Sequence, residues 1–270
     1  MDFTKSHLQH RLTYVFDLDG VIYRGIELQP HAAEVIEALR SSGHNIRFYT
    51  NNATKTRDSY TTRLASMGIS ANSDEVMTSS YATALYLMDI DAVGKTVLQV
   101  GENGMKVELE AVGMKVLRND EESDARIDFV VVGLDREFNY KKLARAQRAI
   151  HEGARFIATN EDATFPVEGG ALLPGGGFMV SAVRTATSVD PLVIGKPETY
   201  AFDKILEMTN TPPDHSIMVG DRLDTDILVG NRAGAQTVLV LTGISSREEA
   251  QQAVGDMRPD RIIDTLAELL

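Results

Sequence analysis

The chain has 270 residues, of which 43% are hydrophobic and 24% are charged, so it can bury one large core or two domains. Its net charge of −12 excludes a general affinity for nucleic acid or for an anionic membrane, and a small anionic ligand would need a local positive site. The absence of cysteine excludes disulfides and thiolate metal sites, and we find neither a secretory leader nor an apolar run of about 18 residues, so we expect a soluble, cytoplasmic protein.

Short apolar runs alternate with amphipathic segments along the chain. The runs are nearly continuous in their apolar character, which predicts buried strands of a parallel sheet. They are Thr13 to Phe16, Asn45 to Tyr49, Lys95 to Val100, Ile127 to Val132, Ala154 to Ala158, Leu192 to Ile194, Ser216 to Val219 and Gln236 to Leu241. Three amphipathic segments between them predict helices that end just before Gly43, Gly68 and Gly153. This alternation predicts an α/β fold with mainly parallel sheets.

Two small polar stretches, Thr78 to Ser80 and Thr185 to Pro191, predict domain boundaries. The roughly 105 residues between them contain strands and helices of their own, which is enough for a domain inserted into the first one. We therefore predict a core formed by residues 1–80 and 188–270, and an inserted domain formed by residues 81–187.

Two aspartates, one residue apart, follow the first predicted strand. Asp17 and Asp19 point the same way in an extended chain, roughly 7 Å apart, and two carboxyl groups at that spacing can flank one phosphorus atom. Ligands of open parallel sheets bind beyond the carboxyl ends of the strands, where these acids would lie. Taken alone, the pattern also fits an ordinary turn. A calcium-binding loop is excluded because Val21 stands at its fifth position.

Polar residues follow three further predicted strands in the same way. Thr50 and Asn51 come after the second strand, Lys196 after the strand that includes Leu192 to Ile194, and Asp221 after the strand that begins at Ser216. Each of these has an ordinary structural alternative, namely an Asx turn, a solvated surface lysine or a helix cap. The repetition of one arrangement at four strand ends favours a functional site.

Two helix starts are predicted beside these strand ends. Pro197 suits the first position of a helix, which would set Lys196 against a helix N-terminus, where a positive charge is unfavourable unless an anion is bound. In the segment after Asp221, we expect Asp224 or Thr225 to cap the next helix.

A parallel sheet brings the carboxyl ends of its strands to one edge. Four acids would then cluster there: Asp17, Asp19, Asp221 and Asp226. Two carboxylates about 4 Å apart repel by roughly 4 kcal/mol at an effective dielectric constant of about 20, so such a cluster needs a cation or protonation. Oxygen ligands without histidine or cysteine select a hard cation such as Mg²⁺, which also binds phosphate. Lys196 and Thr50 would complete a phosphate-binding site.

Four motifs in this order, DLDGVIY, YTNNAT, GKPE and GDRLDTDI, resemble those of the haloacid dehalogenase-like (HAD) phosphohydrolases. The TNN motif and the large insert between the second and third motifs are similar to the NagD-like, 4-nitrophenylphosphatase and phosphoglycolate phosphatase branch. The resemblance covers essentially the whole chain. It implies a Rossmann-like core with a parallel sheet and a large inserted α/β cap domain.

The resemblance also implies roles for the acids. Asp17 would be the nucleophile that forms an aspartyl-phosphate, and Asp19 would be the general acid and then the general base. Asp17, Asp221 and the main-chain carbonyl of Asp19 would hold Mg²⁺, with Asp226 close to the metal. The same catalytic cycle requires identical side chains to have different pKa values, set by their surroundings.

The remaining motif residues would bind phosphate or the leaving group. Thr50 and Lys196 would hold the transferring phosphoryl group, and Asn51 would assist through the same loop. The cap would contact the leaving group, with Asn160 and Asp162 as candidates, although a simple strand end and turn explains both residues individually. Related caps also mediate dimers, so a homodimer through the cap is an expectation.

The leading interpretation is therefore a Mg²⁺-dependent phosphatase of small phosphomonoesters, with a small phosphorylated metabolite as its partner. Two alternatives stay open. A phosphotransferase or mutase on the same fold would deliver the phosphoryl group to an acceptor other than water. A non-catalytic protein that binds a phosphorylated metabolite would show tight binding without turnover. The branch includes enzymes for nucleotide monophosphates, phosphoglycolate, glycerol phosphate and pyridoxal phosphate. The sequence does not distinguish among these substrates.

Overall fold

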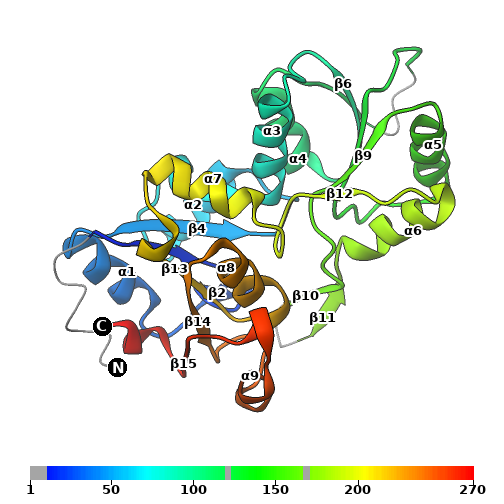
Figure 1. The fold of residues 1–270 in the computed structure, drawn as a ribbon. Helices are drawn as coiled ribbons and strands as arrows, with labels where there is room; N and C mark the ends of the chain where they lie inside the picture. The colour runs from blue at the N-terminus through cyan, green and yellow to red at the C-terminus, as the bar shows by residue number, and fades with distance from the viewer. Residues whose placement is uncertain (1–10, 119–122, 167–170) are drawn as a thin grey trace. The chain divides into compact units, whose positions relative to one another are not determined.

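The computed structural model describes residues 11–118, 123–166 and 171–270. The chain forms two compact units (Figure 1). Unit 1 consists of the residues up to Tyr49, Leu64–Val76 and Phe202–Leu270, and unit 2 consists of Thr50–Arg63 and Met77–Ala201. This division differs in its limits from the predicted core and insert, because the segment after Tyr49 and the residues up to Ala201 group with unit 2.

Unit 1 is built on a six-stranded sheet with the strand order β15-β14-β13-β1-β4-β5. The strands are β1 (Thr13–Phe16), β4 (Asn45–Thr50), β5 (Val76–Thr78), β13 (Ser216–Gly220), β14 (Gln236–Val240) and β15 (Arg261–Ile263). β1 pairs in parallel with β13 and β4, and β14 pairs in parallel with β13 and β15. The carboxyl ends of these strands therefore share one edge of the sheet.

Helices precede or follow these strands in the sequence, and two of them span the limits between the two units. They are α1 (Ala32–Ser41), α2 (Arg57–Ser66), α7 (Tyr200–Thr209), α8 (Leu228–Ala233) and α9 (Arg247–Gln252), with short helical turns η1 (Ser73–Glu75), η3 (Pro213–His215), η4 (Leu223–Ile227), η5 (Gly255–Met257) and η6 (Leu266–Leu269). α1 shows why they form: its apolar residues recur at helical spacing, and those are the buried ones. A short hairpin of β2 (Tyr23–Arg24) and β3 (Glu27–Leu28) follows β1.

Unit 2 contains a second, all-parallel sheet with the order β12-β9-β8-β6-β7. Its strands are β6 (Thr96–Val100), β7 (Lys115–Arg118), β8 (Phe129–Val132), β9 (Arg155–Ala158) and β12 (Leu192–Val193). Its helices are α3 (Ser79–Asp89), α4 (Asn103–Ala111), α5 (Tyr140–His151) and α6 (Gly177–Thr187). An antiparallel hairpin of β10 (Thr164–Pro166) and β11 (Leu172–Pro174) lies between β9 and α6 in the sequence.

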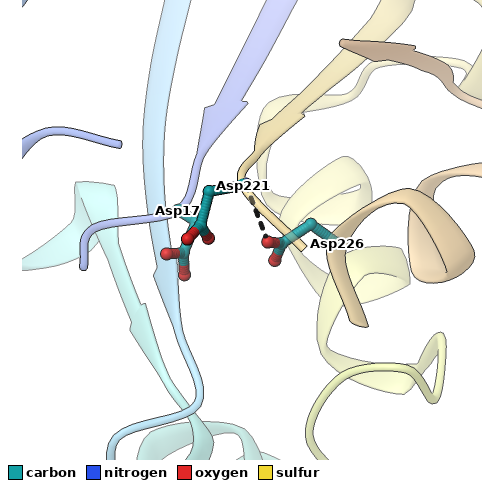
Figure 2. A group of neighbouring side chains, drawn as sticks. All are labelled: Asp17, Asp221 and Asp226. Carbon is teal, nitrogen blue, oxygen red and sulfur yellow. Dashed lines mark hydrogen bonds between the residues drawn. The ribbon is translucent and has the colours of Figure 1, made fainter. Parts of the chain in front are cut away.

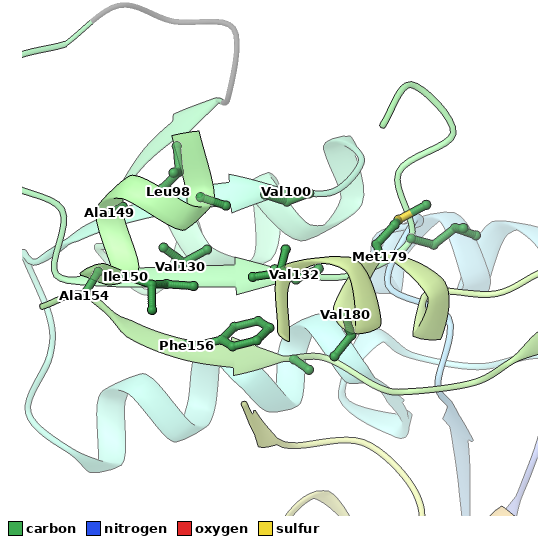
Figure 3. Packing of buried hydrophobic residues seen from close by; sticks show 14 residues of the cluster. Leu98, Val100, Val130, Val132, Ala149, Ile150, Ala154, Phe156, Met179 and Val180 are labelled. Atoms are coloured by element: carbon green, nitrogen blue, oxygen red, sulfur yellow. The ribbon is translucent and has the colours of Figure 1, made fainter. Parts of the chain in front are cut away.

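One hydrophobic cluster of unit 2 lies between its sheet and two of its helices. Figure 3 shows Leu98, Val130 and Phe156 on the strands facing Ile150 of α5 and Val180 of α6. These side chains are buried, and burial of this kind contributes about 1.5 to 3 kcal/mol for each large apolar side chain. The unit therefore has a hydrophobic core of its own.

The predicted α/β class and all eight predicted strands are confirmed, with ends that differ by at most two residues. The three predicted helices are confirmed as α1, α2 and α5. Strands β5, β7 and β15 were missed because they are short edge strands, and only Val116 of β7 is buried, so β7 has no continuous apolar run. Within the described ranges, no helix is both long and apolar enough to cross a membrane.

One half-buried histidine makes the folding of unit 1 sensitive to pH. The backbone N–H of Leu12 donates to Nδ1 of His44 (3.2 Å), and the ring packs edge-on against Tyr14. Burial lowers the pKa of the His44 imidazole. The unfolded chain therefore takes up the proton first, so this contribution to stability is complete above the unfolded pKa of about 6.5 and is lost as the pH falls through the lower, folded pKa.

We expect the free energy of unfolding of the wild type to fall more steeply below about pH 6.5 than that of His44→Asn, whose side-chain oxygen can accept the same hydrogen bond without titrating. Urea unfolding at a series of pH values measures the difference. Parallel pH profiles for the two proteins would contradict the assignment.

Candidate active site

Three buried aspartates meet at one edge of the sheet in unit 1. Asp17, Asp221 and Asp226 each offer one carboxylate oxygen, and these oxygens lie within 4.8 Å of one another. Figure 2 shows Asp17 and Asp221 side by side, with the carboxylate of Asp226 turned toward them. The structure therefore brings together three of the four acids that the sequence predicted to cluster.

Parallel pairing of β1 with β13 places the first two acids. Phe16 pairs with Val219 in the register of these strands, and the backbone N–H of Asp17 donates to the carbonyl of Val219 (2.9 Å). Asp17 is the first residue after β1, and Asp221 is the first residue after β13. The two side chains are adjacent because neighbouring parallel strands end at the same edge.

Asp226 belongs to the helical turn η4 that follows Asp221. Its Oδ2 accepts hydrogen bonds from the backbone N–H groups of Asp221 and Arg222, both at 3.1 Å. The expected cap by Asp224 or Thr225 is wrong, since η4 has no side-chain cap and it is Asp226 that holds these amides. Asp224 is exposed and pairs with Arg222 at 2.8 Å. The carboxylate of Asp226 is thus fixed by the backbone of the neighbouring strand end.

A loop that the sequence analysis did not identify holds Asp221 from the other side. The backbone N–H of Ile244 donates to Oδ2 of Asp221 (2.8 Å), and the N–H of Ser245 donates to its carbonyl (3.0 Å). The hydroxyl of Thr242 donates to the carbonyl of Gly20 (2.7 Å). The signal was present in the sequence, because this loop follows β14 at the same edge as the other strand-end motifs.

Asp19 has a different position from the other three acids. Its side chain is half-buried, and it is not part of the group of oxygens formed by Asp17, Asp221 and Asp226. The backbone here forms a tight turn. Asp19 and Tyr23 form an isolated β-bridge, and the N–H of Gly20 donates to the Tyr23 carbonyl (2.8 Å). Two acids of the DLDG motif thus have different surroundings, as separate chemical roles require.

The three clustered acids fit a hard divalent cation. Their donors are carboxylate oxygens only, and all three side chains are buried, Asp221 and Asp226 each with 1% of their surface exposed. Carboxylates this close repel one another strongly at low effective dielectric, and a cation removes that cost. Oxygen ligands without nitrogen or sulfur are those that Mg²⁺ and Ca²⁺ take.

Gly243 is required for the position of Asp221. A Cβ atom added at Gly243 would lie 1.8 Å from Oδ2 of Asp221, a distance that no side chain tolerates. We expect Gly243→Ala to displace this carboxylate and to weaken Mg²⁺ binding by about 10- to 100-fold, as for losses of groups that orient metal ligands. Calorimetric titration of the metal-free protein with Mg²⁺ measures the change. Unchanged affinity in a folded variant would show that the loop does not position Asp221.

The predicted phosphate-binding residues lie in unit 2, and the structure brings two of them into contact. Asn51 accepts a hydrogen bond from the backbone N–H of Lys196 (2.8 Å) and donates one to its carbonyl (3.0 Å). Thr50 and Lys196 are each 3% exposed, and the Thr50 hydroxyl accepts from the N–H of Asn52 (3.1 Å). The expectation of a helix starting at Pro197 is wrong, because α7 begins at Tyr200. A turn closed by the Glu198 N–H and the Gly195 carbonyl (3.0 Å) precedes it.

The two cap candidates lie in the same network. Asn160 is 4% exposed and donates to the carbonyl of Asn51 (2.7 Å), while Asp162 accepts from the Asn51 side chain (3.0 Å). The backbone N–H of Asp162 donates to Oδ1 of Asn160 (3.1 Å). Both residues are therefore engaged in hydrogen bonds within unit 2.

Two regions of the chain match family models. Residues 14–115 match the model described as haloacid dehalogenase-like hydrolase, and residues 193–269 match a HAD-hydrolase-like model. The acid sugar phosphatase of Staphylococcus epidermidis is 40% identical over 244 residues, which cover 90% of this chain and 92% of the relative. The chloroplastic phosphoglycolate phosphatase 1A of Arabidopsis thaliana is 36% identical over 275 residues, which cover 96% of this chain and 76% of the relative.

A solved structure shares the fold over nearly the whole chain. The glycerol phosphate phosphatase of Mycobacterium tuberculosis, determined in complex with magnesium, is 36% identical and superimposes with a TM-score of 0.88. The match covers 97% of this chain and 77% of that one, and a further structure of the same protein is a complex with calcium. The present chain therefore belongs to the haloacid dehalogenase-like hydrolases, in their NagD-like branch of phosphoric monoester hydrolases.

Proposed function

We propose that this protein is a Mg²⁺-dependent phosphatase of small phosphomonoesters that works through an aspartyl-phosphate on Asp17. The observation that carries the proposal is the convergence of Asp17, Asp221 and Asp226 at one edge of the sheet. Asp17, Asp221 and Asp226, with the main-chain carbonyl of Asp19, would hold the metal. When bound, Mg²⁺ would neutralise phosphate charge and keep Asp17 ionised.

The carboxylate of Asp17 acts as the nucleophile. An oxygen of Asp17 forms a bond to phosphorus while the bond from phosphorus to the ester oxygen breaks, and the phosphoryl group passes to Asp17. Water then attacks this phosphorus, the bond to Asp17 breaks, and free phosphate leaves. This route divides one difficult displacement into two easier ones.

Asp19 moves the protons in both steps. Protonated Asp19 donates its proton to the leaving ester oxygen, which departs as an alcohol. The resulting carboxylate then accepts a proton from the attacking water, so one carboxyl group serves the whole cycle. Its position outside the metal-binding group supports this role, because a metal-bound carboxylate would not readily take up a proton.

Thr50 and Lys196 are proposed to bind the transferring phosphoryl group, with Asn51 supporting them from the same loop. The ammonium of buried Lys196 is poorly screened by water, so its attraction to a phosphoryl oxygen is strong. Substrate selection is proposed to reside in the inserted residues 81–187.

The test is release of free phosphate from a panel of phosphomonoesters, measured as kcat/KM with Mg²⁺ and with a chelator. The panel should contain phosphoglycolate, glycerol phosphate, sugar phosphates, nucleotide monophosphates and pyridoxal phosphate, with 4-nitrophenyl phosphate as a reporter. We expect turnover that requires the metal. Phosphate appearing on an added acceptor would identify a phosphotransferase or mutase, and tight binding without turnover would identify a binding protein; either result would refute the phosphatase proposal.

Two further properties complete the proposal. We propose a cytoplasmic location and a small phosphorylated metabolite as the partner, with no role for nucleic acid or a membrane, consistent with the net charge of −12. We also propose a homodimer formed through the cap, which light scattering of the purified protein would measure.

A further inference from the structure

Asn51 has no side-chain hydrogen left to donate to a phosphate. Its Nδ2 donates one hydrogen to the carbonyl of Lys196 and the other to Oδ1 of Asp162, both at 3.0 Å. Its Oδ1 accepts from the backbone N–H of Lys196 at 2.8 Å. A carboxamide has two donor hydrogens, so these contacts use both of them. The side chain is directed at the main chain of Lys196, on both its N–H and its carbonyl.

Two more residues hold Asn51 itself in place. The Asn160 side chain donates to the Asn51 carbonyl (2.7 Å), and the Ser79 hydroxyl donates to the same oxygen (2.5 Å). Asn160 in turn accepts from the N–H of Asp162 (3.1 Å), which orients the Asp162 carboxylate toward Asn51. Asn51 and Asn160 are 6% and 4% exposed, so these bonds are made away from solvent, where they hold geometry well.

Gly195 provides an independent indication that this arrangement is close-fitting. A Cβ atom at Gly195 would lie 2.5 Å from Oδ1 of Asn51 and 2.5 Å from the carbonyl oxygen of Thr159. Only glycine lets the Asn51 amide approach the backbone before Lys196 this closely.

We propose that Asn51, Asn160 and Asp162 form an amide clamp that fixes the main chain of Lys196, so that all three are positioning residues for this lysine. In this proposal, none of the three residues recognises the leaving group of the substrate. The inference rests on the proposed function, because it assigns to Lys196 the task of binding the phosphoryl group. According to this proposal, Asn51, Asn160 and Asp162 affect phosphoryl transfer only through the position of Lys196.

A double-mutant cycle between Asn51 and Lys196 tests this dependence. We expect Asn51→Ala to lower kcat/KM by roughly 10- to 100-fold, equally for 4-nitrophenyl phosphate and for an alkyl phosphate, and to raise the inhibition constant of inorganic phosphate. In the Lys196→Ala background, Asn51→Ala should then add less than about threefold. Additive losses, or a loss that differs between the two leaving groups, would overturn the proposal.

Rescue by an exchanged pair separates a positioning role from a general structural one. Asn51→Asp places a second carboxylate beside Asp162, and we expect a large loss of kcat/KM. Adding Asp162→Asn restores the hydrogen bond between residues 51 and 162 with its donor and acceptor reversed, but not the bond to the Lys196 carbonyl, and should therefore recover only part of the loss, about threefold or more. A further loss of kcat/KM on adding Asp162→Asn would count against the clamp. Asn139→Ala is the control, since it removes a helix cap of α5 without touching Lys196, and should lower the melting temperature with kcat/KM unchanged.

Hydrogen exchange of the Lys196 backbone amide, followed by NMR, tests the clamp without any turnover. We expect this amide to exchange at least about tenfold faster in Asn51→Ala than in the wild type, and to keep its protection in Asn139→Ala. Equal protection in wild type and Asn51→Ala would refute the clamp. An inactive wild type with a protected Lys196 amide would instead refute the proposed function and leave the clamp in place.

Discussion

Replacing Asp17 by asparagine is expected to lower kcat by at least about 10⁴-fold, the scale seen when a nucleophile is removed from a covalent mechanism. Asparagine keeps the size of the side chain, but its neutral amide cannot attack phosphorus as an anion. One of three mutually repelling carboxylates also disappears, so the metal-free variant should be at least as stable as the wild type. Phosphate release and thermal unfolding measure the two effects.

The matched control for this variant is Asp224→Asn. Asp224 lies in the same motif as Asp221 and Asp226, but its side chain is exposed and pairs with Arg222. We expect it to retain activity within about twofold, since surface substitutions of this kind have small effects. Activity near the wild-type level in Asp17→Asn would contradict the assignment of the nucleophile, whatever the control shows.

Replacing Asp19 by asparagine is expected to slow the hydrolysis of an alkyl phosphate by about 10² to 10⁴-fold, the usual contribution of a general acid. The loss in the first step should be smaller for 4-nitrophenyl phosphate, because 4-nitrophenolate leaves readily without a proton. The second step still needs Asp19 as a base. The variant should therefore release a burst of about one equivalent of 4-nitrophenolate and then turn over slowly.

Rapid-mixing measurements of 4-nitrophenolate resolve this burst, and acid quenching traps the phosphorylated protein. Tyr23→Phe is a useful control in the same turn, since it leaves the backbone contacts of Asp19 in place. Equal losses for both leaving groups without a burst would show that Asp19 does not transfer protons.

Much of the fold was predictable because buried strands leave a local signature. The run Phe129–Val132 is apolar at every position and forms the fully buried strand β8. β7 at the sheet edge is only partly covered, and its sequence, KVLR, carries no such signature. The limits of the compact units could not be predicted from the sequence, because β12 joins the sheet of unit 2 by pairing with β9, which is distant in the chain.

The acids of the candidate site were predictable for a related reason. Asp17 and Asp221 stand directly after recognisable strands, and parallel pairing alone brings them together. The contacts of Asn51 with Asp162 and Lys196 join residues 111 and 145 positions apart, and no local pattern encodes such a pairing. The loop after β14 follows the strand-end pattern. Its backbone N–H contact with Asp221 could not be predicted, because this contact depends on the conformation of the folded loop.

The central claim is that the three buried carboxylates form a divalent cation site required for catalysis. Calorimetric titration of chelator-treated protein with Mg²⁺, in the wild type, Asp221→Asn and Asp224→Asn, tests it most directly. We expect a single site in the wild type and in Asp224→Asn, with affinity at least about tenfold weaker in Asp221→Asn. Equal Mg²⁺ affinity in all three proteins, or no binding in the wild type, would contradict it.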